Sequence, residues 1–335
     1  MSEPTIKIVS ETHNGRWLKF KLSNVIRALA VGVRGSLYTQ IHTYKLYVTG
    51  IVKNTSSLHD EYLAQQFNLI PIYYVPKYEE LTELIDSGKI YEYESFSDIF
   101  EVPDFTIEKS STVSEIIDVK SSDIKIDVSN KTKEKFTEDA FFNPNILLMK
   151  LKSGEEIDVK FGLRLKTGVD GGGIHEPCIV KYEMITSTDE SRIITNEDEM
   201  SDNYYFEMEI ETNGLPANEI LKQALRMEKL RFKIIKRSID NENVDYIMIK
   251  ELTDQKEKED KIYQIEIKIC DHSIGDIISS IINRTYPDIK FCSHYVPHPL
   301  QPLVVIRIND PDAISKFKEA LDIYMGMIDK LQSQL

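Results

Sequence analysis

Residues 271–308 read DHSIGDIISSIINRTYPDIKFCSHYVPHPLQPLVVIRI, and this stretch predicts a helix followed by two strands. Ser273 stands three positions before Asp276, which is the spacing of a capping box at a helix N-terminus. Isoleucines then recur at helical spacing and give the helix one apolar face. They are Ile274, Ile277, Ile278, Ile281 and Ile282. The segments KFCSHYV and PLVVIRI are rich in β-branched and aromatic residues, as strands are.

A second, longer helix is predicted after residue 310, where Asp310 can cap the first turn and Pro311 is tolerated at the first helical position. One side of this helix is apolar. It carries Ile314, Phe317, Leu321, Tyr324, Met325, Ile328 and Leu331. A helix with such a face is stabilised mainly by packing, so we expect it to meet other helices of the chain.

The region before this block is predicted to hold a strand, a helix and a linker. Residues 204–214 alternate as a strand does, and residues 215–235 (LPANEILKQALRMEKLRFKII) have helical periodicity, with Pro216 in the first turn. The basic run Leu225–Arg237 is interpreted as the polar side of that helix. Residues 251–261 (ELTDQKEKEDK) are almost all charged or polar, which predicts a linker.

The N-terminal part is predicted to begin with strands up to residue 22 and to continue with a helix capped by Ser23 or Asn24. Gly32 and Gly35 are expected to weaken or end that helix. Residues 76–143 are acidic and irregular in pattern, which indicates an inserted, β-rich subdomain. Because strands and helices do not alternate as βαβ units, the fold class is predicted to be α+β.

The composition limits the classes of function. The net charge of the 335 residues is −14, whereas a protein that binds nucleic acid by itself usually carries a basic face. No apolar run approaches the ~18–20 residues that span a bilayer, so no membrane partner is expected. The three cysteines, Cys178, Cys270 and Cys292, show no paired spacing, which favours a reducing, intracellular compartment.

His59, Asp60 and Glu61 are residue types from which acid–base sites are made, and they follow one another in the segment 54–72 (NTSSLHDEYLAQQFNLIPI). Ser57 can cap a helix there, and the two acidic residues then lie in its first turn, where the helix dipole favours negative charge. Consecutive helical residues point about 100° apart, so the three side chains cannot converge on one substrate atom. The pattern predicts a helix start rather than a catalytic site.

Two further patterns resemble ligand sites. Residue types that bind zinc gather near the C-terminal block: Cys270, His272, Cys292, His294 and His298. Pro297 and Pro299 exclude a regular helix there, so we predict neither a metal site nor a cofactor. The glycine-rich segment 168–177 (GVDGGGIHEP) lacks the residue order and the following helix of a phosphate-binding loop, so we expect a flexible loop.

Residues 23–36 read SNVIRALAVGVRGS, with Asn24 and Arg27 at the start of the predicted helix. This segment resembles the assembly helix of the third subunit of RNA polymerase II, of the archaeal D subunit and of the bacterial α subunit's assembly domain. Asn24 and Arg27 match, whereas Ala28 replaces a second arginine and Gly35 replaces the usual proline. The resemblance implies that this helix serves subunit assembly.

Three more segments extend the same resemblance. Residues 54–72 are similar to the family's acidic helix start, and the segment around His175 and Pro177 is similar to a block after its hairpin. Residues 206–225 (FEMEIETNGLPANEILKQAL) are similar to its strand and final helix.

The quoted stretch 271–308 resembles a second family, the eleventh subunit of RNA polymerase II and the archaeal L subunit. The matching residues are Asp271, His272, Gly275, Pro287, Asp288, Phe291, Pro297, His298, Pro299, Arg307 and Ile308. In these families the two subunits are separate chains that pair as a heterodimer.

Together the resemblances imply two α-subunit-like dimerisation modules fused in one chain and paired as an intramolecular pseudo-heterodimer. The first module takes residues 1–75 and 204–250, and the second takes residues 262–335. Residues 76–203 form an inserted subdomain, and residues 251–261 form the linker. Such a fusion resembles a polymerase subunit of large DNA viruses of the African swine fever virus group, which implies the host cytoplasm and the virion as locations.

The function implied is a non-catalytic platform for the two largest polymerase subunits and a small tenth- or twelfth-type subunit, with DNA and RNA contacted only through the complex. Candidate subunit-interface residues are Asn24, Arg27, His59, Asp60, Glu61, His175 and Pro177. Candidate packing residues between the modules are Leu29, Val33, Ile274, Ile277, Ile278, Ile281, Phe317, Leu321, Tyr324 and Ile328. The alternatives are a free-standing scaffold of the same fold and a small metal- or His/Asp-dependent enzyme.

Overall fold

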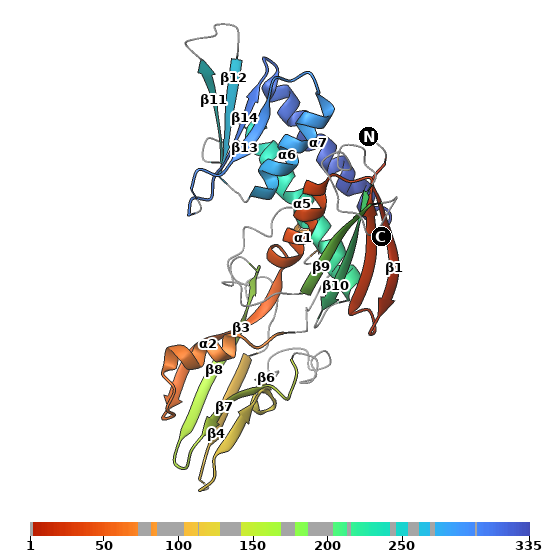
Figure 1. The fold of residues 1–335 in the computed structure, drawn as a ribbon. Coiled ribbons are helices and arrows are strands. Elements are labelled where there is room, and N and C mark those ends of the chain that lie inside the picture. The colour runs from red at the N-terminus through yellow and green to blue at the C-terminus, as the bar shows by residue number, and fades with distance from the viewer. Residues whose placement is uncertain are drawn as a thin grey trace. The chain divides into compact units, whose positions relative to one another are not determined.

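The computed structural model describes residues 3–72, 82–85, 104–112, 114–127, 142–168, 178–186, 204–212, 216–241, 246–253, 261–268, 272–298 and 300–335. Its backbone contacts divide the chain into two compact units (Figure 1). Unit 1 consists of Met1–Tyr38, Ile179–Glu211 and Ala217–Leu335, and unit 2 consists of Thr39–Cys178 and Thr212–Pro216.

Unit 1 has two halves, and we call the first of them the N-half. Its elements are β1 (Thr5–Thr12), β2 (Trp17–Ser23), α1 (Arg27–Thr39), β9 (Cys178–Thr186), β10 (Tyr204–Thr212) and α5 (Ala217–Asp240). The strands form one sheet in the order β1-β2-β10-β9. On β2, Leu18, Phe20 and Leu22 are buried while the residues between them are partly exposed, so one face of the sheet is in the core.

The rest of unit 1, which we call the C-half, repeats this plan. Its elements are β11 (Ile247–Thr253), β12 (Lys261–Ile267), α6 (His272–Thr285), β13 (Cys292–Tyr295), β14 (Val304–Asn309) and α7 (Ala313–Gln332). The sheet order is β11-β12-β14-β13. Each half is therefore a strand–strand–helix–strand–strand–helix unit whose sheet runs first, second, fourth and third strand.

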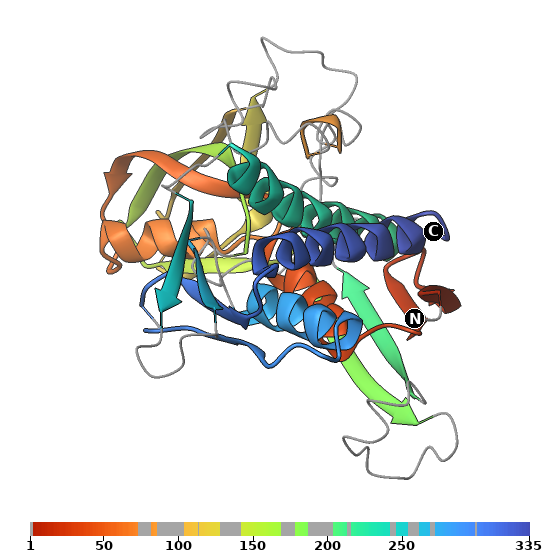
Figure 2. The same cartoon turned by 90° about the horizontal axis from the view of Figure 1, so that it is seen from above.

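The helices of the two halves pack together. Helix α7 lies along both α5 and α6, as Figure 2 shows. A Cβ atom built on Gly32 of α1 would lie 3.0 Å from Cδ1 of Ile277 on α6, so these two helices approach closely where α1 has no side chain. Of the two outcomes expected for Gly32 and Gly35, ending the helix is excluded, because α1 continues to Thr39, whereas weakening of the helix is not tested.

Both ends of the predicted linker 251–261 belong to strands that pair with each other. Glu251, Leu252 and Thr253 belong to β11, Lys261 begins β12, and Thr253 pairs with Lys261. Residues 254–260 lie outside the described part of the chain. The described ends of this segment therefore belong to paired strands of the C-half, and the chain passes from one half to the other after α5, between residues 240 and 247.

Unit 2 is built around an antiparallel sheet with the order β3-β8-β4-β6. Its elements are β3 (Thr43–Asn54), α2 (Asp60–Asn68), β4 (Asp104–Ser110), β5 (Ile117–Lys120), the 3₁₀ turn η3 (Ser121–Asp123), β6 (Lys125–Asp127), β7 (Leu147–Leu151) and β8 (Glu156–Lys166). Strands β5 and β7 form a separate two-stranded sheet. Helix α2 packs on the large sheet through Phe67, whose ring centroid lies 4.7 Å from that of Phe161.

This division differs from the predicted domain boundaries in two places. Residues 39–72 belong with unit 2, because β3 pairs along its length with β8. Strand β9 belongs to unit 1, because it extends the β1-β2-β10 sheet, so the predicted insertion 76–203 ends later than the separate unit does.

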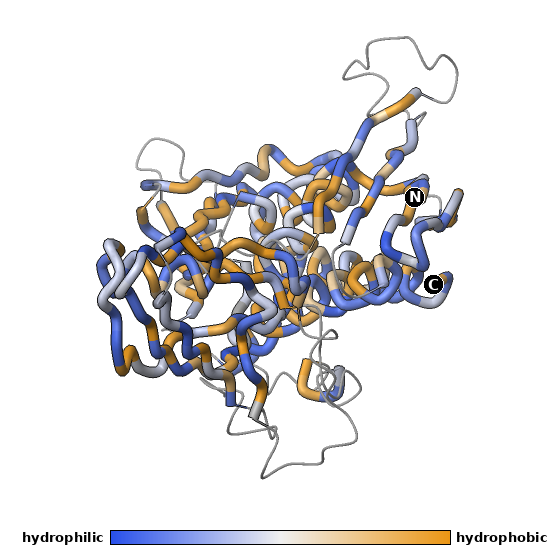
Figure 3. The backbone as a smooth tube through the Cα atoms, turned by 90° about the horizontal axis from the view of Figure 1, so that it is seen from below, coloured by the Kyte–Doolittle hydropathy of each residue, from blue (hydrophilic) through white to orange (hydrophobic). Residues whose placement is uncertain are grey.

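Hydrophobic and hydrophilic residues alternate along the helices and strands, in keeping with elements that bury one face (Figure 3). Within the described residues, no helix has both the length and the apolar character that crossing a membrane requires.

Candidate subunit-assembly interface

The helices α1, α5, α6 and α7 of unit 1 meet in what we call the helix junction. All ten residues predicted to pack between modules are buried, each exposing 1% or less of its surface, and their role between modules stays a prediction. They are Leu29, Val33, Ile274, Ile277, Ile278, Ile281, Phe317, Leu321, Tyr324 and Ile328. Aromatic contact adds to this packing, because the rings of Phe232 and Tyr324 lie 4.1 Å apart.

A buried carboxylate lies in the middle of the helix junction. Glu228 of α5 has no exposed surface. It accepts a hydrogen bond from Ser36 Oγ of α1 (2.5 Å) and from the hydroxyl of Tyr324 of α7 (3.3 Å). It also pairs with Arg231, one turn further along α5 (3.2 Å). One side chain thus joins three helices from both halves.

The interpretation of the run 225–237 as a polar helix side is therefore wrong for Glu228 and Arg231, which are both buried. A buried carboxylate is costly unless it is paired and hydrogen-bonded. The cluster meets that condition with donors that stand 192 and 96 positions away in the sequence. No periodicity in the sequence connects those positions, so sequence reasoning missed the cluster.

The exposed edge of the α5–α7 contact carries three Lys–Asp pairs. They are Lys229–Asp329 (2.5 Å), Lys236–Asp322 (2.5 Å) and Lys318–Asp240 (2.7 Å). Residue numbers rise along α5 as they fall along α7, so the two helices run antiparallel. We call this row of pairs the α5–α7 seam. The bond from Lys318 lowers the pKa of the Asp240 carboxyl.

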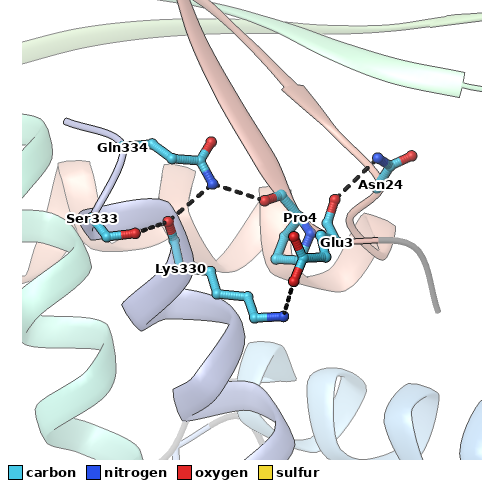
Figure 4. A network of polar contacts seen from close by, with 6 residues as sticks. All are labelled: Glu3, Pro4, Asn24, Lys330, Ser333 and Gln334. Carbon is cyan, nitrogen blue, oxygen red and sulfur yellow. Dashed lines mark hydrogen bonds and ion pairs between the residues drawn. The ribbon is translucent and has the colours of Figure 1, made fainter.

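Gln334, just after α7, is bonded to the chain segment at the start of β1, and Figure 4 shows its bond to Pro4. The side-chain oxygen of Gln334 accepts a hydrogen bond from the Ile6 N–H (2.9 Å), and its nitrogen donates to the Pro4 carbonyl (3.0 Å). The Gln334 amide thus bonds to backbone groups at the start of β1, an edge strand, in the way that the backbone of a neighbouring strand would.

Asn24, a predicted interface residue, bonds to the same N-terminal segment as Gln334 does. Its side chain is exposed and donates to the Glu3 carbonyl (3.0 Å), and its φ of 58° is in the left-handed region that asparagine tolerates. The Glu3 carboxylate in turn pairs with Lys330 (2.8 Å). Asn24 turns the chain between β2 and α1, and neither it nor Ser23 caps the helix, whose first turn is closed by the Ile26 carbonyl.

The other edge of the N-half sheet is bonded by a tyrosine of α1. The Tyr38 hydroxyl donates to the Val180 carbonyl (2.7 Å) and accepts from the Val180 N–H (3.1 Å) on β9. Both edge strands of this sheet are therefore bonded by side chains, β9 by Tyr38 of α1 and β1 by Gln334, which follows α7.

The predicted interface residues of α2 are exposed, and the start of that helix differs from the prediction. His59, not Ser57, is the N-cap residue, and its side chain makes no capping bond. Asn54 holds the turn instead, because its amide donates to the Leu58 carbonyl (2.9 Å) and to Asp60 (2.7 Å). Asp60 and Glu61 lie in the first turn, as predicted.

Arg27 is exposed at the first position of α1. His175 and Pro177 lie outside the described residues. The interface roles of these residues and of the α2 residues stay predictions.

The histidines and cysteine of the C-half have structural contacts. His294 Nδ1 lies 3.0 Å from Ser279 Oγ, and its ring packs against Gly275, where a Cβ would come within 2.7 Å. Burial raises the pKa of the Cys292 thiol to about 12, so it stays protonated at neutral pH. Within the described part, which leaves out Cys270, no three His, Cys, Asp or Glu residues are placed to hold a metal ion.

Comparison with known proteins bears on the C-half. Residues 263–334 match the RNA polymerase Rpb3/Rpb11 dimerisation domain. The chain is 28% identical over 89 residues to the DNA-directed RNA polymerases I and III subunit RPAC2 of Saccharomyces cerevisiae, which covers 26% of this chain and 62% of that protein. It is 31% identical over 62 residues to the probable RPAC2 subunit of Caenorhabditis briggsae, covering 18% of this chain and 39% of that protein.

A third relative is the probable RPAC2 subunit of Caenorhabditis elegans, 38% identical over 45 residues that cover 13% of this chain and 31% of that protein. The chain thus spans less than two thirds of the length of these relatives. The similarity to an RNA polymerase Rpb3/Rpb11 dimerisation domain therefore lies in residues 263–334, from β12 through α7.

Proposed function

We propose that this chain is a non-catalytic assembly subunit of a multisubunit DNA-directed RNA polymerase, and that the two halves of unit 1 are an intramolecular counterpart of a dimer of two subunits. The observation that carries the proposal is the repeated topology of unit 1. The half that matches a dimerisation domain packs through its helices on a half with the same order of strands and helices.

The buried contacts between the halves support this interpretation. A dimerisation domain leaves an apolar helix face for its partner, and here most apolar residues of α6 and α7 are buried. Glu228, Ser36 and Tyr324 tie the two halves together inside that contact. Because the halves belong to one chain, their effective concentration is on the order of mM for a short connection. The resemblance to fused viral subunits accords with this arrangement.

The platform role rests on the exposed residues of α1 and α2. We propose that Arg27 and the α2 start, with His59, Asp60 and Glu61, contact the two largest subunits or a small tenth- or twelfth-type subunit. Polymer synthesis, metal binding and contact with DNA and RNA then belong to those partners. The protonated Cys292 thiol and the packed His294 ring favour a structural role for the residues that resembled a zinc site.

The test is affinity purification of the tagged full chain from its own source at several salt concentrations, with mass spectrometry of the proteins recovered. We expect two very large polymerase subunits in stoichiometric amount and RNA synthesis by the eluate. Recovery of the chain alone at every salt concentration would refute the assembly role and favour the free-standing scaffold.

A matched pair of variants tests the surface. Arg27→Glu reverses an exposed charge on α1, and Lys7→Glu reverses an exposed charge on β1. We expect Arg27→Glu to reduce recovery of a large subunit several-fold while Lys7→Glu leaves recovery unchanged. Equal recovery with both variants would remove Arg27 from the interface without affecting the proposed pairing of the halves.

A further inference from the structure

We propose that the α5–α7 seam and the buried Glu228 select the pairing of α5 with α7 of the same chain and oppose the pairing of α5 with α5 of a second copy. This inference goes beyond the polymerase role, because it concerns a choice that the purified chain makes by itself.

Helices α5 and α7 correspond residue by residue. Each closes its half, and Ala313 lies 96 positions after Ala217. All eight buried residues of α7 fall on a buried residue of α5 at this spacing. The α7 residues are Ala313, Phe317, Ala320, Leu321, Tyr324, Met327, Ile328 and Leu331. Their α5 counterparts are Ala217, Leu221, Ala224, Leu225, Glu228, Arg231, Phe232 and Ile235.

This correspondence makes an α5–α5 contact between two copies a realistic competitor. A second α5 presents apolar residues at the same spacing as α7 does. Because apolar burial is not directional, it does not distinguish between the two partners. Selection between the two pairings must then come from groups that differ between the helices, namely the seam charges and the buried polar residues.

The seam charges are complementary only in the α5–α7 pairing. When each α7 residue is replaced by its α5 counterpart, Lys229–Asp329 becomes Lys229–Lys233, and Lys236–Asp322 becomes Lys236–Arg226. Two attractive pairs become repulsive. The third pair stays attractive, because Asp240 would face Lys222 in place of Lys318.

The buried centre has the same bias. Tyr324 and Glu228 occupy corresponding positions and bond to each other across the pairing (3.3 Å). In an α5–α5 contact of this geometry, two Glu228 carboxylates would face each other in a buried site. Two carboxylates that share a buried site cannot both ionise without a large cost. Tyr324 avoids that cost because its hydroxyl donates a hydrogen bond to the single Glu228 carboxylate.

The test is a double charge reversal in the full chain, Lys229→Glu with Lys236→Glu. Acidic residues there would oppose Asp329 and Asp322 within the chain but attract Lys233 and Arg226 of a second copy. Parent and variant are refolded from denaturant at low and high protein concentration, and their masses are measured by light scattering after gel filtration. We expect the parent to return as a monomer at both concentrations. We expect the variant to form a dimer fraction that grows several-fold with concentration and shrinks with added salt.

Two controls decide the result. The quadruple variant that adds Asp322→Lys and Asp329→Lys exchanges the charges across the seam, and we expect it to be monomeric again, with a melting temperature close to that of the parent. The pair Lys7→Glu with Lys261→Glu makes the same change in net charge at exposed positions outside the seam and should stay monomeric. Equal monomer fractions for the parent and the double variant, or a quadruple variant that behaves like the double one, would overturn the proposal.

Discussion

Helices α5 and α7 occupy the same place in the two halves of unit 1, yet they bury different chemistry. At two corresponding positions α5 carries Glu228 and Arg231 where α7 carries Tyr324 and Met327, and all four are buried. A buried carboxylate accepts only surroundings that supply hydrogen-bond donors, whereas an apolar surface accepts many partners. The comparison teaches that one topology can be repeated while the choice of partner is made by a few polar residues of one half.

The first helices of the halves differ in a second way. Gly275 of α6 lets its own sheet come close, since a Cβ there would lie 2.8 Å from Val304 Cγ2. Gly32 of α1 instead lets the other half come close, at Ile277 of α6. The C-half therefore uses its glycine for internal packing, and the N-half uses its glycine for the contact between the halves.

The largest expected effect comes from a charge in the shared core. Ile278 of α6 has no exposed surface, so Ile278→Asp buries a carboxylate among apolar side chains and should destabilise the chain by about 4 kcal/mol or more. Limited proteolysis and thermal melting measure the outcome. If the halves depend on each other, cleavage sites appear in both; sites confined to the C-half would show that the N-half folds by itself. Ile314→Asp, at a partly exposed position of α7, is the matched control.

The next effect tests the polar centre of the helix junction, which consists of Glu228 and its hydrogen-bonding partners. Glu228→Ala removes the acceptor shared by Ser36, Arg231 and Tyr324, and breaking a buried pair from one side typically costs about 3–5 kcal/mol. Chemical denaturation measures the loss. The double variant Glu228→Leu with Arg231→Met removes both charges and should recover a large part of the stability. A single variant as stable as the parent would mean that the centre contributes nothing to holding the halves together.

Much of the C-half could be predicted from the sequence because its local signals agree with its packing. The isoleucine stripe of α6 and the apolar side of α7 recur at helical spacing, and β14 is rich in β-branched residues and buried along most of its length. Strand β11 was missed, because the charged residues after Glu251 resemble a linker whether or not they join two paired strands.

The N-half could be predicted less well, because its strands β1 and β2 are separated in the sequence from β9 and β10 by unit 2. Strand β9 was placed in the insertion, since no local pattern shows that it extends the β1-β2-β10 sheet. The same limit applies to the helix junction. Its apolar members were predicted from periodicity, whereas Glu228 was assigned to an exposed face, because a charged residue is usually solvated.

A smaller effect tests the close approach inside the C-half. Gly275→Ala places a methyl group within 3.0 Å of His294 and Val304, and overpacking of this kind typically costs about 1–3 kcal/mol, partly offset by the better helix propensity of alanine. Gly326→Ala is the matched control, because Gly326 of α7 has no atom within 4 Å of its Cβ position. That variant should gain about 0.5–1 kcal/mol. Equal changes in unfolding free energy for both variants would contradict the close packing of α6 on its sheet.

The smallest effect is a pH dependence that belongs to the C-half alone. Burial lowers the pKa of His294 below its ordinary value of 6.5, His272 lowers it further, and Asp276 opposes the shift. Between the folded and the unfolded pKa the unfolded chain binds more protons at this residue than the folded chain. The contribution of His294 to stability is therefore complete above pH 6.5 and declines as the pH falls through that value. One proton sets a limit of about 1.4 kcal/mol per pH unit, and solvent screening of the partly exposed ring makes the loss smaller.

His294→Gln keeps a hydrogen-bonding partner for Ser279 but cannot titrate, so the difference in unfolding free energy between parent and variant should shrink from pH 7.5 to pH 5.5. A difference that stays constant over this range would mean that His294 takes up no more protons on unfolding, and that α6 does not bury the ring against its sheet as Gly275 allows.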